Sequence, residues 1–207
     1  MIIEKIEIGK DVSTMKLPDI DLYTHWNLYS KRILNIEDEI TAWDYHIVKD
    51  IININFEDMG KPIDQRKPII ILINSCGGLL DITNSIIDAI QMSITPVYTV
   101  NVGNALSGGC LIFLAGEKRF TTNNSYCMAH AGRGGIFGNY SETVEQTKVW
   151  DEQVKNMGEY IVSRTGIDEK TWKKYKNKDW WMNADQQIEF GFATEKLENF
   201  EQLFGGI

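Results

Sequence analysis

Pro68-Ile-Ile-Ile-Leu-Ile-Asn-Ser-Cys-Gly-Gly78 is the segment from which the architecture of this 207-residue chain follows. Its uninterrupted apolar run at residues 69–73 is typical of a strand that is buried on both faces of a parallel sheet. An amphipathic helix is predicted directly after it, at about residues 79–92, and a second strand then runs from Thr95 toward Ser107. Strand, helix and strand in this order predict right-handed βαβ units, and therefore an α/β fold built in layers.

Further strands and helices are predicted on both sides of this segment, and together they form a single predicted domain over residues 1–207. The expected elements are a strand near 32–37, a helix over 41–56 that buries Trp43, Ile47, Ile51 and Ile54, strands at 119–122 and 126–130, a long helix from about 141 to 166, and short helices at 167–175 and 184–190. Ser141 or Thr143 is the expected cap of the long helix. Residues 1–30 show no clear period and are expected to form an irregular arm or short strands.

Composition and charge argue against several classes of function. A net charge of −8 with a pI near 4.9 argues against a nucleic-acid surface. The longest apolar runs are too short to cross a bilayer and the N-terminus lacks a signal-peptide pattern, so no membrane partner is expected. The cysteines lack metal-type spacing, so no metal is expected. Their odd number without a signal peptide predicts reduced thiols in the cytoplasm. No cofactor is expected. These cysteines are Cys76, Cys110 and Cys127.

Three side chains in separate segments suggest nucleophilic catalysis. Ser107 lies where a β-rich run gives way through small residues to an apolar helix, so its hydroxyl is expected at a helix N-terminus, where free N–H groups stabilise an oxyanion. His130 ends a second apolar strand. Asp179 opens the segment Trp180-Trp-Met182, which is expected to desolvate the carboxylate. A nucleophile, a base and an orienting carboxylate in this chain order predict a serine hydrolase.

Each of these residues also has a structural interpretation, which the residue pattern leaves open. Ser107 is suited to cap a helix, since the Gly-x-Ser-x-Gly elbow of α/β-hydrolases is only half present around it. His130 fits a hydrogen-bonded structural group, and Asp179 fits the cap of a helix that follows. The other histidines, His25 in the irregular arm and His46 inside a helix, are less suited as the base.

The turn Asn74-Ser-Cys-Gly-Gly78 favours the hydrolase hypothesis. Two glycines after a buried strand let the backbone approach a ligand closely, and free N–H groups there could bind an oxyanion or an extended peptide. The alternative is a tight strand-to-helix turn with no ligand. A mononucleotide loop is disfavoured, because the chain has neither a Gly-Lys-Ser/Thr nor a Gly-x-Gly-x-x-Gly motif.

Taken together, five segments resemble the proteolytic subunit of the Clp protease, the ClpP family of serine peptidases, over about residues 29–197. They are Ile73-Asn-Ser-Cys-Gly-Gly78, Ala105-Leu-Ser-Gly-Gly109, Lys118-Arg-Phe120, Asn124-Ser-Tyr-Cys-Met-Ala-His130 and Asp179-Trp-Trp-Met-Asn-Ala-Asp-Gln-Gln-Ile-Glu-Phe-Gly191. The resemblance implies a crotonase-like α/β fold, with Ser107 as nucleophile, His130 as general base and Asp179 as the third member of a triad. It also implies that the backbone N–H groups of Gly78 and Gly108 form an oxyanion hole.

The same resemblance implies how substrate and copies of the chain are arranged. Residues 132–165 would form a handle, a strand plus a long helix, which interleaves two stacked heptameric rings around a degradation chamber. Peptides or unfolded proteins would bind there in extended form. The implied substrate contacts are Gly77, Leu79, Gly132 and Arg133. An AAA+ unfoldase is the implied partner, although residues 1–28 form a divergent arm that does not match the family's axial loops.

Three departures from the family pattern fall near the site. Cys76 replaces a usual proline, Gly108 replaces a larger residue such as methionine, and Ala131-Gly132 replaces a Gln-Pro pair. Gly108 keeps the backbone donor but removes a side chain that would shape the substrate pocket.

Several other functions stay open on the sequence. They are a virus-encoded capsid or prohead maturation protease of the same fold, a catalytically idle ring subunit, and a crotonase-fold acyl-CoA enzyme. A serine–lysine peptidase is a nearer rival, but its best candidate, Lys118, lies in a polar turn that offers no reason for a lysine to act as a base.

Overall fold

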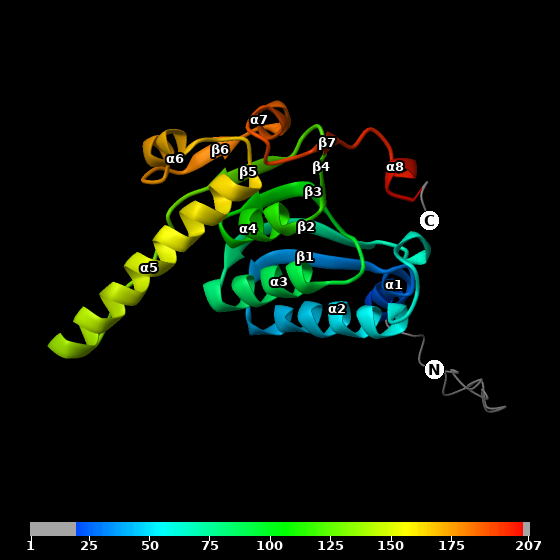
Figure 1. Ribbon diagram of the computed structural model, residues 1–207, viewed down its shortest axis with the longest axis horizontal. Coiled ribbons are helices and arrows are strands. Elements are labelled where there is room, and N and C mark those ends of the chain that lie inside the picture. The colour runs from blue at the N-terminus through cyan, green and yellow to red at the C-terminus, as the bar shows by residue number, and fades with distance from the viewer. Residues whose placement is uncertain (1–19, 205–207) are drawn as a thin grey trace. The chain divides into compact units, whose positions relative to one another are not determined.

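The computed structural model describes residues 20–204 (Figure 1), and the chain divides after Lys31 into two compact units. In the first unit the described element is the helix α1 (Ile20–Tyr29), where Trp26 and Tyr29 meet edge to face with ring centroids 5.9 Å apart. The expected irregular arm or short strands are therefore wrong for residues 20–29, and residues 1–19 lie outside the described part. The single domain over residues 1–207 stays a prediction.

The second unit is built on a seven-stranded sheet. Its strands are β1 (Ile33–Ile40), β2 (Ile69–Gly78), β3 (Val97–Leu106), β4 (Lys118–Thr121), β5 (Tyr126–Ala129), β6 (Trp180–Met182) and β7 (Glu195–Lys196). The main path is β1-β2-β3-β4-β7 with parallel pairing throughout, and β5 branches off beside β3. Among the described strands, only the β5–β6 pair is antiparallel. The mostly parallel sheet confirms the predicted α/β class.

Among the described helices of the second unit, α4 is the one that packs against both the sheet and two other helices. The helices of this unit are α2 (Tyr45–Asp58), α3 (Leu80–Met92), α4 (Gly108–Ala115), α5 (Tyr140–Arg164), α6 (Glu169–Tyr175), α7 (Ala184–Glu189) and α8 (Glu201–Phe204), with 3-10 turns at Ala42–Asp44 and Ile63–Gln65. α4 contacts β2 and β3 of the sheet as well as α3 and α5. Every residue of α4 is buried, as expected of a helix that is apolar on all sides.

The strands β2 and β3 carry the turns that form the site. They pair in parallel with Ile69 opposite Val97, so both strands end at the same edge of the sheet. The side chains from Ile69 to Ile71 are fully buried, which confirms the strand predicted from the apolar run. A register shift between Ile73 and Ser75 marks where the pairing becomes irregular before the Gly-Gly end of β2.

The helix predicted over residues 41–56 is present, but it begins later. Thr41 caps a 3-10 turn, and α2 begins only at Tyr45. Trp43 lies within this turn and is 88% exposed, so its assignment to the buried face is wrong: helical periodicity has not yet begun there. The predicted inner residues that are buried are Ile47, Ile51 and Ile54.

The long helix α5 reaches away from the sheet (Figure 1), and its buried residues, Gly158 and Ile161, lie near its C-terminal end. The strand expected before this helix does not form, since residues 132–138 pair with no described strand. Four of these seven residues are glycines, which weaken strands because they lack side chains to pack.

The cap of α5 differs from the predicted one. Asn139, rather than Ser141 or Thr143, precedes the helix and accepts a hydrogen bond from the Glu142 N–H. The Glu142 carboxylate in turn accepts from the Asn139 N–H at 2.9 Å. This reciprocal pair is a capping box, in which an asparagine takes the place of the usual serine or threonine.

Candidate active site

Ser107 occupies the sharp junction between β3 and α4. Its backbone has φ 52° and ψ −117°, a conformation that residues with a side chain rarely adopt. Two hydrogen bonds hold it there: Ser107 N–H donates to Met128 O at 2.8 Å, and Leu111 N–H donates to Ser107 O at 3.2 Å. Such a strained strand-to-helix turn exposes the side chain at the sheet edge, as in a nucleophile elbow. The predicted location of Ser107 at a helix N-terminus is confirmed.

His130 follows β5 and faces this hydroxyl. β5 runs parallel to β3 with Leu106 opposite Met128, so the residues after the two strands lie at the same edge. His130 Nε2 is 2.7 Å from Ser107 Oγ, a hydrogen-bond distance. Burial lowers the pKa of His130 more than the neighbouring Asp179 carboxylate raises it, so the imidazole is neutral at physiological pH. A neutral imidazole can accept the proton of a serine.

Asp179 lies on the other side of the imidazole. Antiparallel pairing of β5 with β6 sets Ala129 opposite Trp180, which brings the preceding Asp179 beside His130. Its Oδ1 is 3.6 Å from His130 Nδ1, close enough for electrostatic attraction but too long for a good hydrogen bond. The structure therefore brings the three predicted residues together, with a loose contact between the histidine and the aspartate.

A guanidinium makes the closer contact with Asp179. Arg133 Nη2 donates to Asp179 Oδ2 at 2.5 Å, across 46 residues of sequence. No sequence pattern signals this pair, because Arg133 lies in a glycine-rich segment without apolar periodicity. The expected desolvation by tryptophans is wrong, since the Asp179 side chain is 34% exposed. Trp180 is instead buried against Tyr175, with ring centroids 4.3 Å apart.

The turn Gly77-Gly78 lies directly against Ser107 and Gly108. A Cβ on Gly77, whose φ is +90°, would stand 2.7 Å from Ser107 Cβ and 2.9 Å from Gly108 N, so only glycine permits this approach. The nitrogen of Gly78 is 3.5 Å from the place that a Cβ on Gly108 would occupy. Gly78 and Gly108 thus lie close together beside Ser107, as two donors of an oxyanion hole must.

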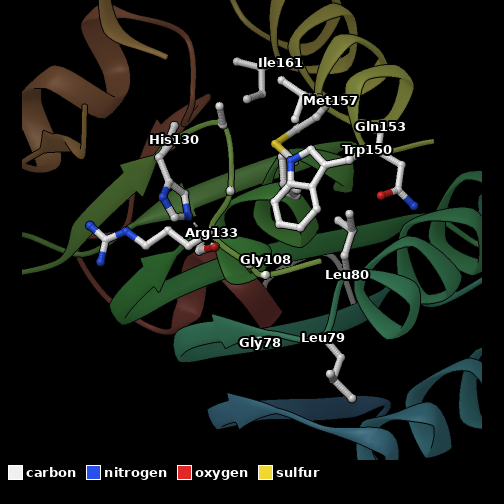
Figure 2. Close-up of a pocket in the computed structure, with 18 residues that line it drawn as sticks. Gly78, Leu79, Leu80, Gly108, His130, Arg133, Trp150, Gln153, Met157 and Ile161 are labelled. Carbon is white, nitrogen blue, oxygen red and sulfur yellow. Dashed lines mark hydrogen bonds between the residues drawn. The ribbon is translucent and has the colours of Figure 1, made fainter. Parts of the chain in front are cut away.

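A cavity of about 310 Å³ opens beside Ser107 and His130 (Figure 2). Of the predicted substrate contacts, Leu79, Gly132 and Arg133 line this cavity. Gly77 does not: it is buried, and its N–H donates to Ser75 Oγ at 3.1 Å. Its role is the close approach to Ser107 described above.

The helix α5 supplies a wall of the cavity that was not predicted. Figure 2 shows Trp150 and Met157 on the side of the cavity opposite His130, near Leu80 of α3. The α5 residues that line the cavity are Trp150, Gln153, Val154, Met157 and Ile161. These residues recur about once per helical turn, a stripe that could have identified this face, but the sequence does not indicate what the stripe meets.

Lys118, the alternative base considered from the sequence, lies away from the cavity. Lys118 pairs with Glu195 at 3.8 Å, lies over the Tyr98 ring, and does not line the cavity. Within residues 20–204, no group of three or more histidine, cysteine or acidic side chains is placed to hold a metal ion. In the same range, no helix combines the length and the apolar character needed to cross a membrane.

Comparison with known proteins identifies relatives of this chain. The family model described as Clp protease matches residues 19–199. The ATP-dependent Clp protease proteolytic subunit 1 of Protochlamydia amoebophila is 30% identical over 199 residues, which are 94% of this chain and 93% of that protein. The ATP-dependent Clp protease proteolytic subunit 2 of Treponema denticola is 34% identical over 143 residues, 68% of this chain and 72% of that protein.

A solved structure supports the same relationship. A ClpP1 mutant from Listeria monocytogenes superimposes with a TM-score of 0.75 at 25% sequence identity, covering 87% of this chain and 99% of that chain. Together with the mostly parallel sheet, this similarity confirms the predicted ClpP-like, crotonase-type α/β fold.

Proposed function

The chain belongs to the Clp protease family of peptidases, and from this premise we propose that it is a serine endopeptidase of the ClpP type. Its substrates are peptides or unfolded proteins, and its triad is Ser107, His130 and Asp179. The observation that carries the proposal is the 2.7 Å contact between Ser107 Oγ and His130 Nε2, at a cavity that Gly78 and Gly108 also line.

The reaction proceeds through an acyl-enzyme. Ser107 Oγ attacks the carbonyl carbon of a peptide bond while its proton passes to His130 Nε2, and the N–H groups of Gly78 and Gly108 stabilise the oxyanion. His130 then gives this proton to the leaving amine as the C–N bond breaks, which leaves an ester on Ser107. Water, deprotonated by His130, then attacks the ester carbonyl. The C–Oγ bond breaks, the peptide acid leaves, and His130 returns the proton to Ser107 Oγ. Asp179 stays ionised and stabilises the imidazolium in both halves of the reaction.

The bound peptide lies extended along the cavity and contacts Leu79 on one side and Gly132 and Arg133 on the other. These residues line the cavity from two separate segments, the end of β2 and the glycine-rich segment after His130. Three side chains and two backbone amides perform every chemical step, so hydrolysis itself is independent of ATP.

The active form is a homo-oligomer in which two stacked heptameric rings enclose the sites and an AAA+ unfoldase supplies substrate. Support comes from α5 and the segment before it, where the described chain leaves apolar side chains exposed: Phe137, Tyr140 and Val149. A second copy would remove these side chains from water, which is favourable.

The relatives' names, proteolytic subunits of an ATP-dependent protease, support an ATPase partner. The free cysteines support a cytoplasmic location.

Hydrolysis of a fluorogenic peptide and of an unfolded protein by the full-length chain tests the proposal. Ser107→Ala should reduce kcat by about 10³-fold or more, because it removes the nucleophile. Ser163→Ala is the matched control: its hydroxyl is exposed and donates only to the Tyr160 carbonyl one helical turn away, so the wild-type rate is expected. Equal turnover by wild type and Ser107→Ala would overturn the proposal, as would turnover of acyl-CoA without peptide cleavage.

A further inference from the structure

The carboxylate of Asp179 is shared between two groups. Asp179 Oδ1 lies 3.6 Å from His130 Nδ1, whereas Arg133 Nη2 donates to Oδ2 at 2.5 Å. The contact with Arg133 is a charge-assisted hydrogen bond, and the contact with His130 is longer than any good hydrogen bond. Arg133 therefore holds the carboxylate more strongly than the imidazole does.

This unequal sharing bears directly on what a triad carboxylate does. A carboxylate that accepts from the Nδ1–H of His130 fixes the tautomer whose Nε2 takes the serine proton, and it stabilises the imidazolium that results. Arg133 opposes both effects, because it binds the carboxylate itself and its positive charge lowers the pKa of His130. Asp179, from the segment before β6, and Arg133, from the segment before α5, thus act on the charge of this imidazole in opposite directions.

We propose that Arg133 is a positioning residue that restrains the triad: its ion pair with Asp179 keeps the carboxylate out of hydrogen-bond contact with His130 and holds hydrolysis below its full rate. The inference rests on the proposed function, since it concerns the same site. Arg133 exerts this effect chiefly through Asp179, adds a direct repulsion of the His130 imidazolium, and makes no contact with the reacting atoms.

The local structure allows Arg133 to release its partner. Its side chain is 74% exposed, and it lies between Gly132, with φ +90°, and Gly134. Figure 2 shows the Arg133 side chain extending beneath His130 and away from Trp150. Because the flanking glycines give this segment wide backbone freedom, Arg133 can leave Asp179 without any movement of β5 or β6.

The test compares Arg133→Gln with wild type in the full-length protein, using an uncharged fluorogenic peptide. Glutamine keeps a long polar side chain but removes the charge, so kcat/KM should rise about 3–10-fold, mainly through kcat. The pKa of His130, measured by NMR titration, should rise because the imidazolium loses a repulsive neighbour, and the acidic limb of the pH profile should move to higher pH. Lys178→Gln, which removes a positive charge beside Asp179 in the sequence but leaves the ion pair, is the matched control and should change neither quantity.

Two further variants separate positioning from a merely structural role. In an Asp179→Asn background, the larger part of the gain from Arg133→Gln should disappear, because Arg133 no longer has a carboxylate to withhold. Arg133→Lys keeps the charge but loses the planar fork, so its gain should be smaller than that of Arg133→Gln. A lower or unchanged rate for Arg133→Gln, or a gain that persists in full without Asp179, overturns the inference.

Failure of this inference is distinguishable from failure of the proposed function. If neither wild type nor Arg133→Gln cleaves peptide or reacts with a fluorophosphonate, the proposed function is wrong. If both cleave peptide at equal rates in a manner that depends on Ser107, and the pKa of His130 is the same in both, only the role of Arg133 is wrong.

Discussion

At Gly108, directly after Ser107, buried neighbours leave no room for a side chain. A Cβ there would stand 2.5 Å from Thr83 Oγ1 and 3.2 Å from Ile40 Cδ1. Thr83 is fully buried and its hydroxyl donates to Leu79 O at 2.9 Å, so it cannot turn aside without losing that bond. The space that a larger residue would need at this position is thus filled from α3 and β1, which explains why this chain carries glycine there.

Gly108→Ala should therefore lower the free energy of unfolding by about 1–2 kcal/mol, despite the better helix propensity of alanine, because overpacking forces buried neighbours to shift. Urea unfolding measures this loss. In a Thr83→Ala background the same substitution should cost less, since the obstructing Oγ1 is gone. Equal costs in the two backgrounds would contradict the steric explanation.

The environment of His130 predicts the pH dependence of hydrolysis. Its pKa is lowered chiefly by burial, and the base must be neutral, so kcat/KM should persist until the pH falls below the ordinary histidine value of about 6.5. Asp179→Asn removes the charge that raises this pKa, and should move the acidic limb to still lower pH while reducing kcat by about 10²-fold or more. A wild-type midpoint above the ordinary value would contradict the burial effect.

At the scale of residues, the positions of Ser107 and His130 could be predicted and the environment of the Asp179 carboxylate could not. Small residues between a strand and an apolar helix indicate Ser107, and a strand end indicates His130, because parallel strands end at a common edge where ligands bind. The contact of Arg133 with Asp179 depends on the direction of a side chain in a glycine-rich segment. No periodicity constrains such a direction.

At the scale of elements, the carbonyl groups at the C-terminal end of α4 receive their hydrogen bonds from an arginine of α5. Arg164 Nε donates to Leu114 O at 2.8 Å, and its Nη2 donates to Ala115 O at 3.2 Å and to Gly116 O at 2.8 Å. Carbonyls at a helix C-terminus have no partner within the helix, so these bonds supply what α4 lacks. The last turn of α5 thereby anchors the helix that Ser107 precedes.

Arg164→Ala should lower the free energy of unfolding by about 2–3 kcal/mol, because three carbonyls lose a charged donor. Thermal or chemical denaturation measures the loss. Lys155→Ala on the exposed part of α5, where Lys155 pairs with Glu159 at 3.6 Å, is the matched control and should change stability by less than about 0.5 kcal/mol. Similar small losses in both variants would contradict the anchoring role.

Elements with a buried apolar face could be predicted from the sequence, short ones such as β5 and α7 included, but the three-residue strand β6 could not. Burial imposes apolar runs on β2 and β3 and an amphipathic pattern on α3, and these patterns are visible along the chain. β6 spans only Trp180–Met182 and is held by its pairing with β5, which lies far away in sequence. Its formation depends on tertiary contacts that no local pattern reports, although it is what brings Asp179 to the site.

At the scale of the whole second unit, Asp58 joins segments that are distant in sequence. Its fully buried carboxylate accepts from Arg32 Nη1 at 2.6 Å and Nη2 at 2.8 Å, from Lys61 Nζ at 2.8 Å and from Thr95 Oγ1 at 2.8 Å. The Arg32 guanidinium holds the pKa of Asp58 far below its ordinary value. The end of α2, the start of β1 and the approach to β3 are thus tied to one charged group.

Asp58→Asn should lower the free energy of unfolding by about 3–5 kcal/mol at neutral pH, because it leaves Arg32 without its buried partner. The folded pKa is depressed, so the carboxylate stabilises the fold above its unfolded value of about 3.9, and this stabilisation is lost as the pH falls toward the folded value. Urea unfolding at pH 7 and at pH 3 should therefore show a smaller difference between wild type and variant at the lower pH. A difference that does not vary with pH would contradict this ionic role.

The claim that Ser107 is an activated nucleophile is tested most directly by mass spectrometry of the full-length protein after reaction with a fluorophosphonate. One adduct is expected, on the peptide that contains Ser107, and His130→Ala should slow its formation by about 10²-fold or more because the base is gone. An unmodified wild-type protein, or an adduct that still forms in Ser107→Ala, would contradict the account.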